Sequence, residues 1–306
     1  MRFSNDTNNR ILMKIYVTGS SGRVGKAVMK MIPKAIPVNL RDNTIDLKKA
    51  LSDATHVIHL AASLKFNDRK ELWNTNYELT KKVVEATPKN ARIIYASSIA
   101  VYGKKLAEIP ASEKTECNPN TDYGKAKYEG EKEVMKRDNS ISLRIAVVYG
   151  PNFDDYYKMM SALKKEKIPI IGDGKNHIPF VHVEDVAQAI KNSLDAKPGI
   201  YLISGESIAQ KELIEFVCNE LNVNPPKRRI PKFLIGPLFS IKMMISSGKS
   251  LDFLTKEHLD ILMHNRIFDS SKAKKELGFS PRPVKEGIKQ MVDEYKNNLK
   301  YARTEA

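Results

Sequence analysis

Residues 14–25, KIYVTGSSGRVG, together with the stretch KAVMKMI at 26–32, decide the fold. KIYVT is a short apolar run with β-branched residues that stops at a glycine, as a buried strand does. A strand, a glycine-rich turn and a helix in this order are typical of a dinucleotide-binding turn. We therefore predict that Gly19 permits the tight turn, Gly22 lets the backbone approach a pyrophosphate, and Gly25 lets the helix pack closely on the strand.

The chain that follows alternates between strand and helix patterns. Apolar strands are expected at 36–40, 55–62, 92–97 and 141–150, and a helix is expected at 71–86. This alternation predicts an α/β fold with a doubly wound parallel sheet of the Rossmann type. The segment 41–54, RDNTIDLKKALSDA, is short, so one strand-helix unit should be compressed there.

The pattern changes after Pro151, where a smaller and mainly helical lobe is expected. It should contain a helix at 154–167, the glycine turn GDGKN at 172–176, apolar helices within 207–260 and a closing helix at 284–300. We predict a disordered leader at 1–12, a dinucleotide-binding domain at 13–150 to which the chain returns around 178–204, and a substrate lobe formed by 151–177 and 205–306.

Composition limits the classes of function. The chain has 306 residues and a formal net charge of +15, but its basic residues are scattered and match no nucleic-acid motif, so we expect no nucleic-acid partner. Two distant cysteines argue against a disulfide framework or a metal site, which favours a reducing cytoplasm. The longest apolar run, FLIGPLFSI at 233–241, is too short to cross a bilayer. A homodimer is left open.

The stretch YGKAKYEGE at 123–131 carries the candidate chemistry. It sets Tyr123 and Lys127 four residues apart in an expected helix, so the two side chains share a face. A nearby cation favours the phenolate and lowers the pKa of a tyrosine. Such a tyrosine can pass a proton to or from an alcohol oxygen.

Taken together, eight motifs resemble the extended branch of the short-chain dehydrogenase/reductase superfamily, over nearly all of 14–290. They are TGSSGRVG, HLAA, NTNYELT, YASSIAVYG, YGKAKYEGE, LRIAVVYGP, FVHVEDVA and DSSKAKKELGF. The resemblance implies NAD or NADP as cofactor and a small-molecule substrate. It also implies that Ser98 holds the substrate oxygen, that Tyr123 is the acid-base residue, and that Lys127 binds the nicotinamide ribose.

The predicted cofactor contacts lie at the strand ends, in the glycine turn and on the catalytic helix. Near the second strand, Arg41 could grip a 2′-phosphate and Asp42 could bind a free 2′-hydroxyl, which leaves NAD and NADP open with a slight lean to NADP. The full predicted set is Gly19, Gly22, Arg23, Val24, Gly25, Arg41, Asp42, Asp46, Leu47, Leu60, Ala61, Ala62, Asn76, Tyr123 and Lys127.

Departures from the family pattern narrow the reaction. Ser98-Ile99-Ala100 replaces the Thr-Asp-Glu of the dehydratases, and Val147 and Ile178 replace residues that grip a nucleotide diphosphate. His177, Lys175 and Arg266 are the candidate substitutes. We therefore predict a dehydrogenase or reductase of a secondary alcohol or ketone, with a nucleotide-sugar epimerase and a non-catalytic dinucleotide sensor as alternatives.

Overall fold

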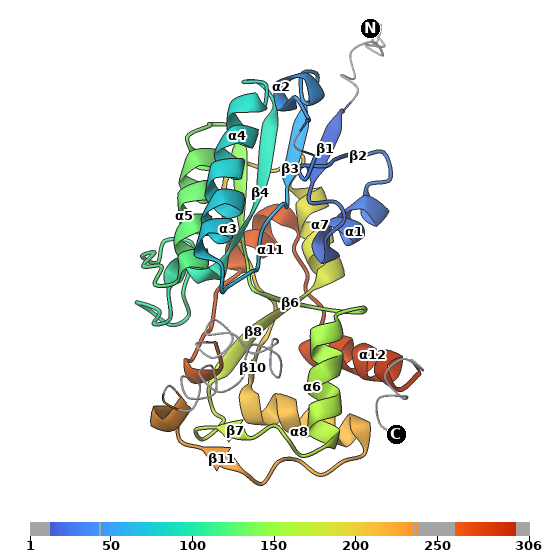
Figure 1. Ribbon diagram of the computed structural model, residues 1–306, viewed down its shortest axis with the longest axis vertical. Helices are drawn as coiled ribbons and strands as arrows, with labels where there is room; N and C mark the ends of the chain where they lie inside the picture. The colour runs from blue at the N-terminus through green and yellow to red at the C-terminus, as the bar shows by residue number, and fades with distance from the viewer. Residues whose placement is uncertain (1–12, 43, 236, 238–260, 298–306) are drawn as a thin grey trace, which may run out of the picture.

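The computed structural model describes residues 13–42, 44–235, 237 and 261–297, which form two lobes (Figure 1). The upper lobe holds a parallel sheet of six strands. Its spatial order is β2 (Ile36–Val38), β1 (Ile15–Thr18), β3 (His56–His59), β4 (Arg92–Ser98), β5 (Ser140–Ile145) and β9 (Gly199–Ile203).

Helices cover both faces of this sheet, so the predicted doubly wound architecture is confirmed. One face is covered by α1 (Arg23–Met31), α7 (Val183–Asn192) and α11 (Ser271–Leu277), and the other by α3 (Arg69–Trp73), η1 (Asn74–Glu78), α4 (Leu79–Ala86) and α5 (Asp122–Met135). The apolar core on the α1 side includes Val28, Ile94 and Val186, all fully buried.

The strand order reverses beside β1, and this positions the ligand crevice. β2 pairs with one edge of β1 and β3 with the other, so Thr18 and His59 end neighbouring strands at the same edge of the sheet. Parallel α/β sheets bind ligands at such a reversal. The compressed unit is confirmed as well, because the described residues between β2 and β3 contain only the four-residue helix α2 (Leu47–Ala50).

The prediction of one strand over 141–150 was wrong. The chain bends at Ala146, whose amide donates to the Ile203 carbonyl at 3.0 Å, and β6 (Val147–Tyr149) then leaves the main sheet. β6 pairs with β8 (His177–His182), which also pairs with β10 (Ser207–Ala209). A continuous apolar run carries no signal for a change of partner, because both sheets bury it equally well.

In the part of the lower lobe that the structure describes, short strands pack against long helices. β7 (Ile170–Ile171) pairs with β11 (Arg229–Ile230), and α6 (Asp154–Lys164), α8 (Gln210–Leu221) and α12 (Val284–Asn297) surround a core that includes Tyr149, Phe180 and Met291. The chain returns to the upper lobe through α7 and β9, whereas β8 stays in the small sheet. The leader 1–12 and residues 238–260 of the expected apolar helices lie outside the described residues.

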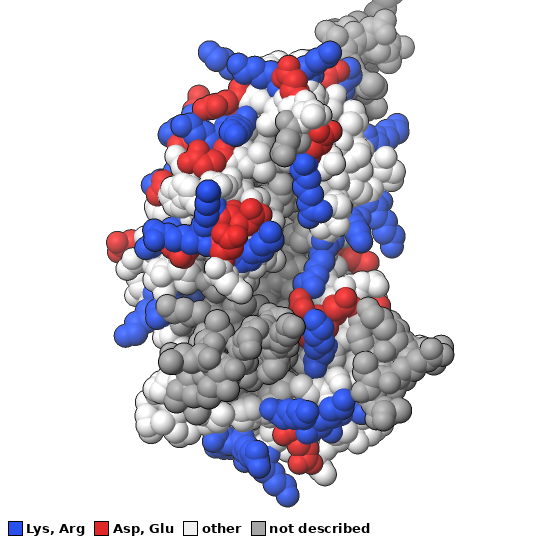
Figure 2. All heavy atoms as spheres, viewed as in Figure 1, with Lys and Arg blue, Asp and Glu red and all other residues white. Residues whose placement is uncertain are grey.

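The described residues also show how surface charge is distributed and how apolar the helices are. Lys and Arg side chains are spread over both lobes on the face shown in Figure 2, with Asp and Glu side chains among them. Within the described part of the chain, no helix has the length and apolar character needed to cross a membrane.

Candidate active site

The glycine turn after β1 presses directly on the end of β3. Gly19 has a φ of +70°, and a Cβ atom there would lie 2.6 Å from the Ala61 nitrogen. At Gly25 a Cβ atom would lie 2.2 Å from the Gly19 carbonyl oxygen, and the Gly22 amide donates to that same oxygen at 3.0 Å. Glycine at positions 19 and 25 therefore lets the turn pack tightly on its own backbone and on the chain after β3, while the missing side chain of Gly22 leaves room for a ligand where α1 begins.

A buried histidine ties together the strand ends behind this turn. His59 accepts from the Thr18 hydroxyl at Nδ1 (2.6 Å) and donates from Nε2 to the Thr80 hydroxyl (3.0 Å), a tautomer assigned because Thr80 itself donates to the Asn76 carbonyl. Burial and, to a smaller extent, the charge of Lys127 together lower the pKa of His59 to about 3. The ring is therefore neutral and links β1, β3 and α4.

Asn76 lies in the π-helical turn η1 and is fully buried. Its side-chain oxygen accepts from the Ser63 amide at 3.1 Å, and its side-chain nitrogen donates to the Ser63 carbonyl at 3.0 Å. The amide thus fixes the loop that follows β3 at the edge of the crevice. A direct contact between Asn76 and the cofactor stays a prediction.

Helix α5 starts against the turn that carries Ser98. Thr121 caps the helix by accepting from the Gly124 amide at 3.0 Å, and a Cβ atom on Gly124 would lie 2.6 Å from the Ala100 carbonyl oxygen. Ala100 belongs to η2 (Ile99–Tyr102), and its amide donates to the Ser98 hydroxyl oxygen at 3.1 Å. The close packing of α5 on η2 thus sets Gly124, the neighbour of Tyr123 in the chain, against Ala100, whose amide binds Ser98.

Lys127 is the most unusual residue of the site, because only 2% of its surface is exposed. Its ammonium lies 4.1 Å from the centre of the Tyr95 ring, a cation-π contact. Burial lowers the pKa of Lys127 to about 7, although Glu131 raises it in part. Lysine is almost never buried without a specific reason, so the fold maintains this cation one helical turn from Tyr123.

A buried ion pair between α5 and β5 holds the helix on the sheet. Glu131, one turn beyond Lys127, accepts from the Arg144 guanidinium at 2.7 Å and from the Ser142 hydroxyl at 2.8 Å. Arg144 also donates to the Tyr102 hydroxyl at 2.7 Å, which connects α5 and β5 to η2. The sequence analysis missed this network. Its signals were a charged residue inside the apolar strand LRIAVV and a glutamate four residues after Lys127.

Several predicted cofactor residues have partners within the protein. Arg23 pairs with Asp155 at 2.8 Å and lies 4.5 Å from the centre of the Phe153 ring, so it bridges the lobes. Val24 packs against the apolar cores of both lobes, Asp46 caps α2 by accepting from the Lys49 amide at 3.2 Å, and Leu47 packs on a small core beside β2.

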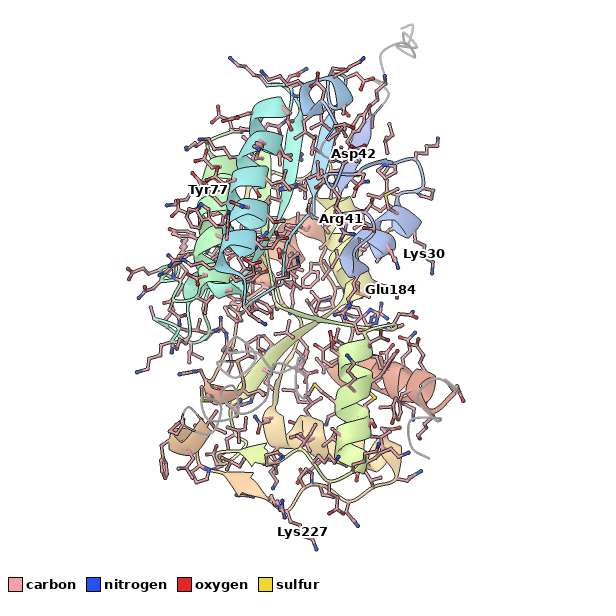
Figure 3. The ribbon with its side chains drawn as sticks, viewed as in Figure 1. Lys30, Arg41, Asp42, Tyr77, Glu184 and Lys227 are labelled. Atoms are coloured by element: carbon pink, nitrogen blue, oxygen red, sulfur yellow. The ribbon has the colours of Figure 1, made fainter. Side chains whose placement is uncertain are left out.

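Arg41 and Asp42 are exposed and lie in the upper lobe near β2 (Figure 3). The Asp42 carboxylate accepts from the Thr44 hydroxyl at 2.6 Å and from the Thr44 amide at 2.9 Å. These bonds, the side-chain bond foremost, lower the pKa of Asp42. Because one carboxylate oxygen of Asp42 already accepts hydrogen bonds from Thr44, Arg41 is the more available of the two side chains for binding a cofactor.

The sequence analysis offered Arg266 as a substitute for the diphosphate-binding arginine, but the structure engages this side chain elsewhere. It is buried, and its guanidinium donates to the Gly103 carbonyl at 2.8 Å and to the Ile99 carbonyl at 3.0 Å. It therefore supports the η2 turn beside Ser98. His177 bonds Asn265 at 3.0 Å through Nδ1, and Lys175 lies exposed in the second glycine turn.

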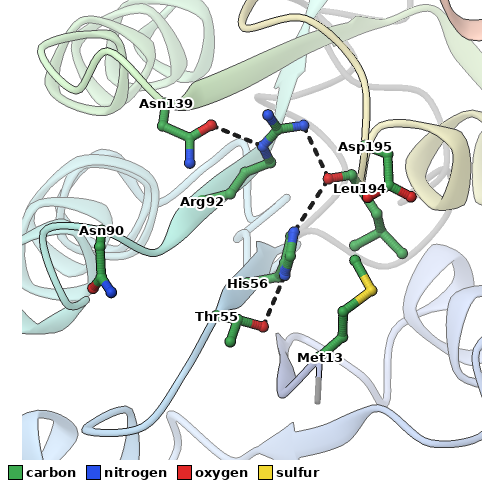
Figure 4. A pocket seen from close by; sticks show the side chains of 8 residues that line it. All are labelled: Met13, Thr55, His56, Asn90, Arg92, Asn139, Leu194 and Asp195. Atoms are coloured by element: carbon green, nitrogen blue, oxygen red, sulfur yellow. Dashed lines mark hydrogen bonds between the residues drawn. The ribbon is translucent and has the colours of Figure 1, made fainter. Parts of the chain in front are cut away.

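A hollow of about 410 Å³ lies at the opposite end of the sheet, where β1, β3, β4 and β5 begin (Figure 4). Arg92 lines it and donates to the carbonyls of Ser193, Leu194 and Ala196 at 3.1, 2.9 and 2.6 Å. The guanidinium thus satisfies carbonyls that follow α7, and this hollow belongs to the support of the fold rather than to the crevice.

Comparison with known proteins decides the family. Residues 15–204 match the model of the NAD dependent epimerase/dehydratase family. The chain belongs to this family. As a member it is an enzyme of the extended short-chain dehydrogenase/reductase type that uses a nicotinamide cofactor, as the sequence analysis predicted.

The similar proteins carry the names of two different activities, steroid dehydrogenation and sugar epimerisation. A 3β-hydroxysteroid dehydrogenase/decarboxylase of Arabidopsis thaliana is 28% identical over 306 residues, which cover 90% of this chain and 70% of the relative. A UDP-glucose 4-epimerase of Vibrio cholerae is 26% identical over 336 residues, which cover 94% and 98%. The solved UDP-glucuronic acid 4-epimerase of Bacillus cereus in complex with NAD has a TM-score of 0.72 at 22% identity, with 93% and 99% covered.

The fold supplies a place for this cofactor. The glycine turn has no room for side chains at Gly19 and Gly25, and the first amides of a helix have no partner within it, so the start of α1 suits a pyrophosphate. Leu60, Ala61 and Ala62 follow β3 at the same edge, with Ala61 donating to the Thr18 hydroxyl oxygen at 3.5 Å. The residues present therefore fit a bound dinucleotide.

Proposed function

We propose that this enzyme interconverts a secondary alcohol and a ketone, with Ser98, Tyr123 and Lys127 as its catalytic residues. The observation that carries the proposal is the buried Lys127 ammonium, one helical turn from Tyr123 on α5. A cation withdrawn from water interacts strongly with nearby charge, so it favours the phenolate of a neighbouring tyrosine.

In this mechanism the bound cofactor accepts or supplies the hydride. Tyr123 removes the hydroxyl proton when the alcohol is oxidised and returns it when the ketone is reduced. Ser98 holds the substrate oxygen, because its hydroxyl can donate while its oxygen accepts from the Ala100 amide. Lys127 stabilises the phenolate and binds the nicotinamide ribose. The neutral His59 keeps a second cation away from this cluster.

The cofactor would lie across the strand reversal. Amides of residues 23–25 would bind the pyrophosphate at the start of α1, and Arg41 or Asp42 would bind the adenosine ribose. Leu60, Ala61 and Ala62 would line the path toward Tyr123. Arg23 contributes here mainly by linking α1 to α6, because its guanidinium is engaged with Asp155.

We infer an apolar substrate rather than a nucleotide sugar. Ile178 belongs to the lower-lobe core and is only 3% exposed, and the half-buried Val147 packs against that core, so neither position offers a charge to a diphosphate. Arg266 is committed to the η2 carbonyls. Each missing charge-assisted hydrogen bond is worth about 1.5–3 kcal/mol. The steroid-dehydrogenase relative supports this choice.

Epimerisation is the second candidate, and the likeness to the UDP-glucose 4-epimerase of Vibrio cholerae favours it. An epimerase would retain the oxidised intermediate and reduce it from the other face, whereas a dehydrogenase releases it. The residues proposed for catalysis serve both outcomes.

Turnover of a small panel tests the proposal. The purified enzyme is incubated with NAD or NADP and a 3β-hydroxysteroid, 2-octanol, UDP-glucose or UDP-glucuronic acid, while reduced cofactor and sugar epimers are measured. We expect net cofactor reduction with an apolar alcohol and weak binding of both UDP-sugars. Epimer formation without net reduction, together with micromolar UDP-sugar binding, would instead establish the epimerase.

A further inference from the structure

The loop that follows β3 is built as a stiff turn. Ser63 is bound at both its amide and its carbonyl by Asn76, and the Lys65 amide donates to the Ser63 hydroxyl oxygen at 3.3 Å. The Phe66 amide donates to the Leu64 carbonyl at 2.9 Å, which closes a γ-turn. Further along, Asp68 caps α3 by accepting from the Glu71 amide at 2.9 Å. The loop is therefore held at both ends.

This turn presents apolar side chains at the catalytic tyrosine. The Phe66 ring packs edge-on against the Tyr123 ring, with 5.4 Å between their centres. Leu64, two residues earlier, is 59% exposed, so folding leaves more than half of its side chain in contact with water. Lys65 between them directs its ammonium to Glu71, 3.9 Å away. The turn thus offers carbon surface beside the proposed reaction centre.

We propose that Leu64 and Phe66 form the wall that contacts the carbon skeleton of the substrate and selects it by apolar area. This inference rests on the proposed function, because it places the reacting oxygen at Tyr123. Phe66 orients the Tyr123 ring, and Leu64 extends the wall away from it. A stiff wall suits this role, since it needs no ordering when the substrate binds.

Two features favour the substrate skeleton as the occupant. Phe66 contacts the proposed acid-base residue itself, so the wall is continuous with the reaction centre. The anchoring through Asn76, a buried residue, fixes the position of Leu64 in the absence of any partner. Exposed apolar side chains that are held in place beside a polar site are characteristic of ligand-binding surfaces.

Calorimetric binding of 2-butanone, 2-hexanone and 2-octanone to the NAD-loaded enzyme tests the wall without any need for turnover. For the wild type, affinity should rise about fourfold for each added methylene group that the wall buries. For Leu64→Ser this increment should fall by at least about half, while Leu64→Met should retain it. Ile36→Ser is the matched control, since Ile36 is 41% exposed at the far end of the edge strand β2.

The outcomes separate this inference from the proposed function. If affinity does not rise with chain length, or if Leu64→Ser shows the wild-type increment, the wall does not contact the substrate skeleton. If the increment is present and is lost in Leu64→Ser, but no ketone is reduced in a separate assay that supplies NADH or NADPH as the hydride donor, the wall stands and the proposed reaction fails. Equal losses in Leu64→Ser and Ile36→Ser would show a general loss of apolar surface and would overturn the inference.

Discussion

The chain contains two glycine turns of similar appearance and different surroundings. In the first, added Cβ atoms at Gly19 and Gly25 would strike backbone atoms at 2.6 and 2.2 Å. In the second, Gly172 and Gly174 also have positive φ values, +64° and +72°, but their first contacts are the side chains of Lys232 and Lys211. The first turn is closed by backbone packing, whereas Gly172 of the second turn meets the flexible side chain of Lys232 and needs glycine mainly for its backbone conformation.

This difference indicates which of the two turns is fixed by its surroundings. Backbone cannot move aside for a side chain, so the first turn is fixed by the approach of β1, β3 and α1, and by the ligand that such a turn suits. The second turn connects β7 to β8 and is bordered by a flexible lysine. We therefore expect the first turn to tolerate an added side chain less well than the second.

The largest effect is expected from alanine in the two turns. Gly25→Ala should destabilise the protein by more than about 4 kcal/mol or prevent folding, because the Cβ atom would overlap the Gly19 carbonyl. Gly172→Ala should cost only about 1–2 kcal/mol, the strain of a left-handed backbone, since the Lys232 side chain can move. Urea denaturation measures both. Equal losses for the two variants would contradict the contrast between the turns.

The next largest effect is expected from replacing Lys127, the buried cation. Because the pKa of Lys127 falls to about 7 in the folded protein, folding carries the full penalty of a buried charge below that pH. The penalty shrinks as the pH rises from about 7 toward the ordinary lysine pKa of about 10.4. Lys127→Met should therefore raise the melting temperature more at about pH 6 than at about pH 9, while abolishing turnover.

Lys232→Met is the matched control, because Lys232 is exposed in the lower lobe. Its melting temperature should follow that of the wild type at both pH values. A Lys127→Met variant whose stabilisation is independent of pH would show that Lys127 is not a strained buried cation.

The smallest effect concerns the choice of cofactor. Arg41→Ala should weaken NADP binding by about tenfold and leave NAD binding unchanged, since a lost charge-assisted hydrogen bond costs about 1.5–3 kcal/mol. Lys175→Ala, in the second glycine turn, should affect neither cofactor. Fluorescence titration with both reduced cofactors measures this, and NAD binding that is tighter than NADP binding in the wild type would remove the role given to Arg41.

The sequence predicted the parts of the molecule that are specified by local pattern. The turn at Gly19–Gly25 and the pair Tyr123 and Lys127 are short-range signals, and the compressed unit after β2 follows from its length alone. The bend at Ala146 could not be predicted, because it depends on a hydrogen bond to Ile203 and on pairing with β8. Such contacts join residues that are far apart in the chain.

Side-chain partners were the least predictable feature of the site. Arg23 and Arg266 both have the chemistry of phosphate ligands, yet one pairs with Asp155 and the other supports the η2 turn. The wall at Leu64 and Phe66 carries no motif, because an apolar loop residue is interpretable only once its neighbour Tyr123 is known. Local sequence gives the type of a side chain but not the partner that the fold supplies.

Hydride transfer with and without the Tyr123 hydroxyl tests the proposed chemistry most directly. Tyr123→Phe should lower turnover of the substrate found in the panel by at least about 10²–10⁴-fold, because it removes the proton carrier, while cofactor affinity stays within about twofold. Tyr128→Phe, a half-buried tyrosine on the same helix, should behave like the wild type. Turnover by Tyr123→Phe at the wild-type rate would contradict acid-base catalysis by Tyr123.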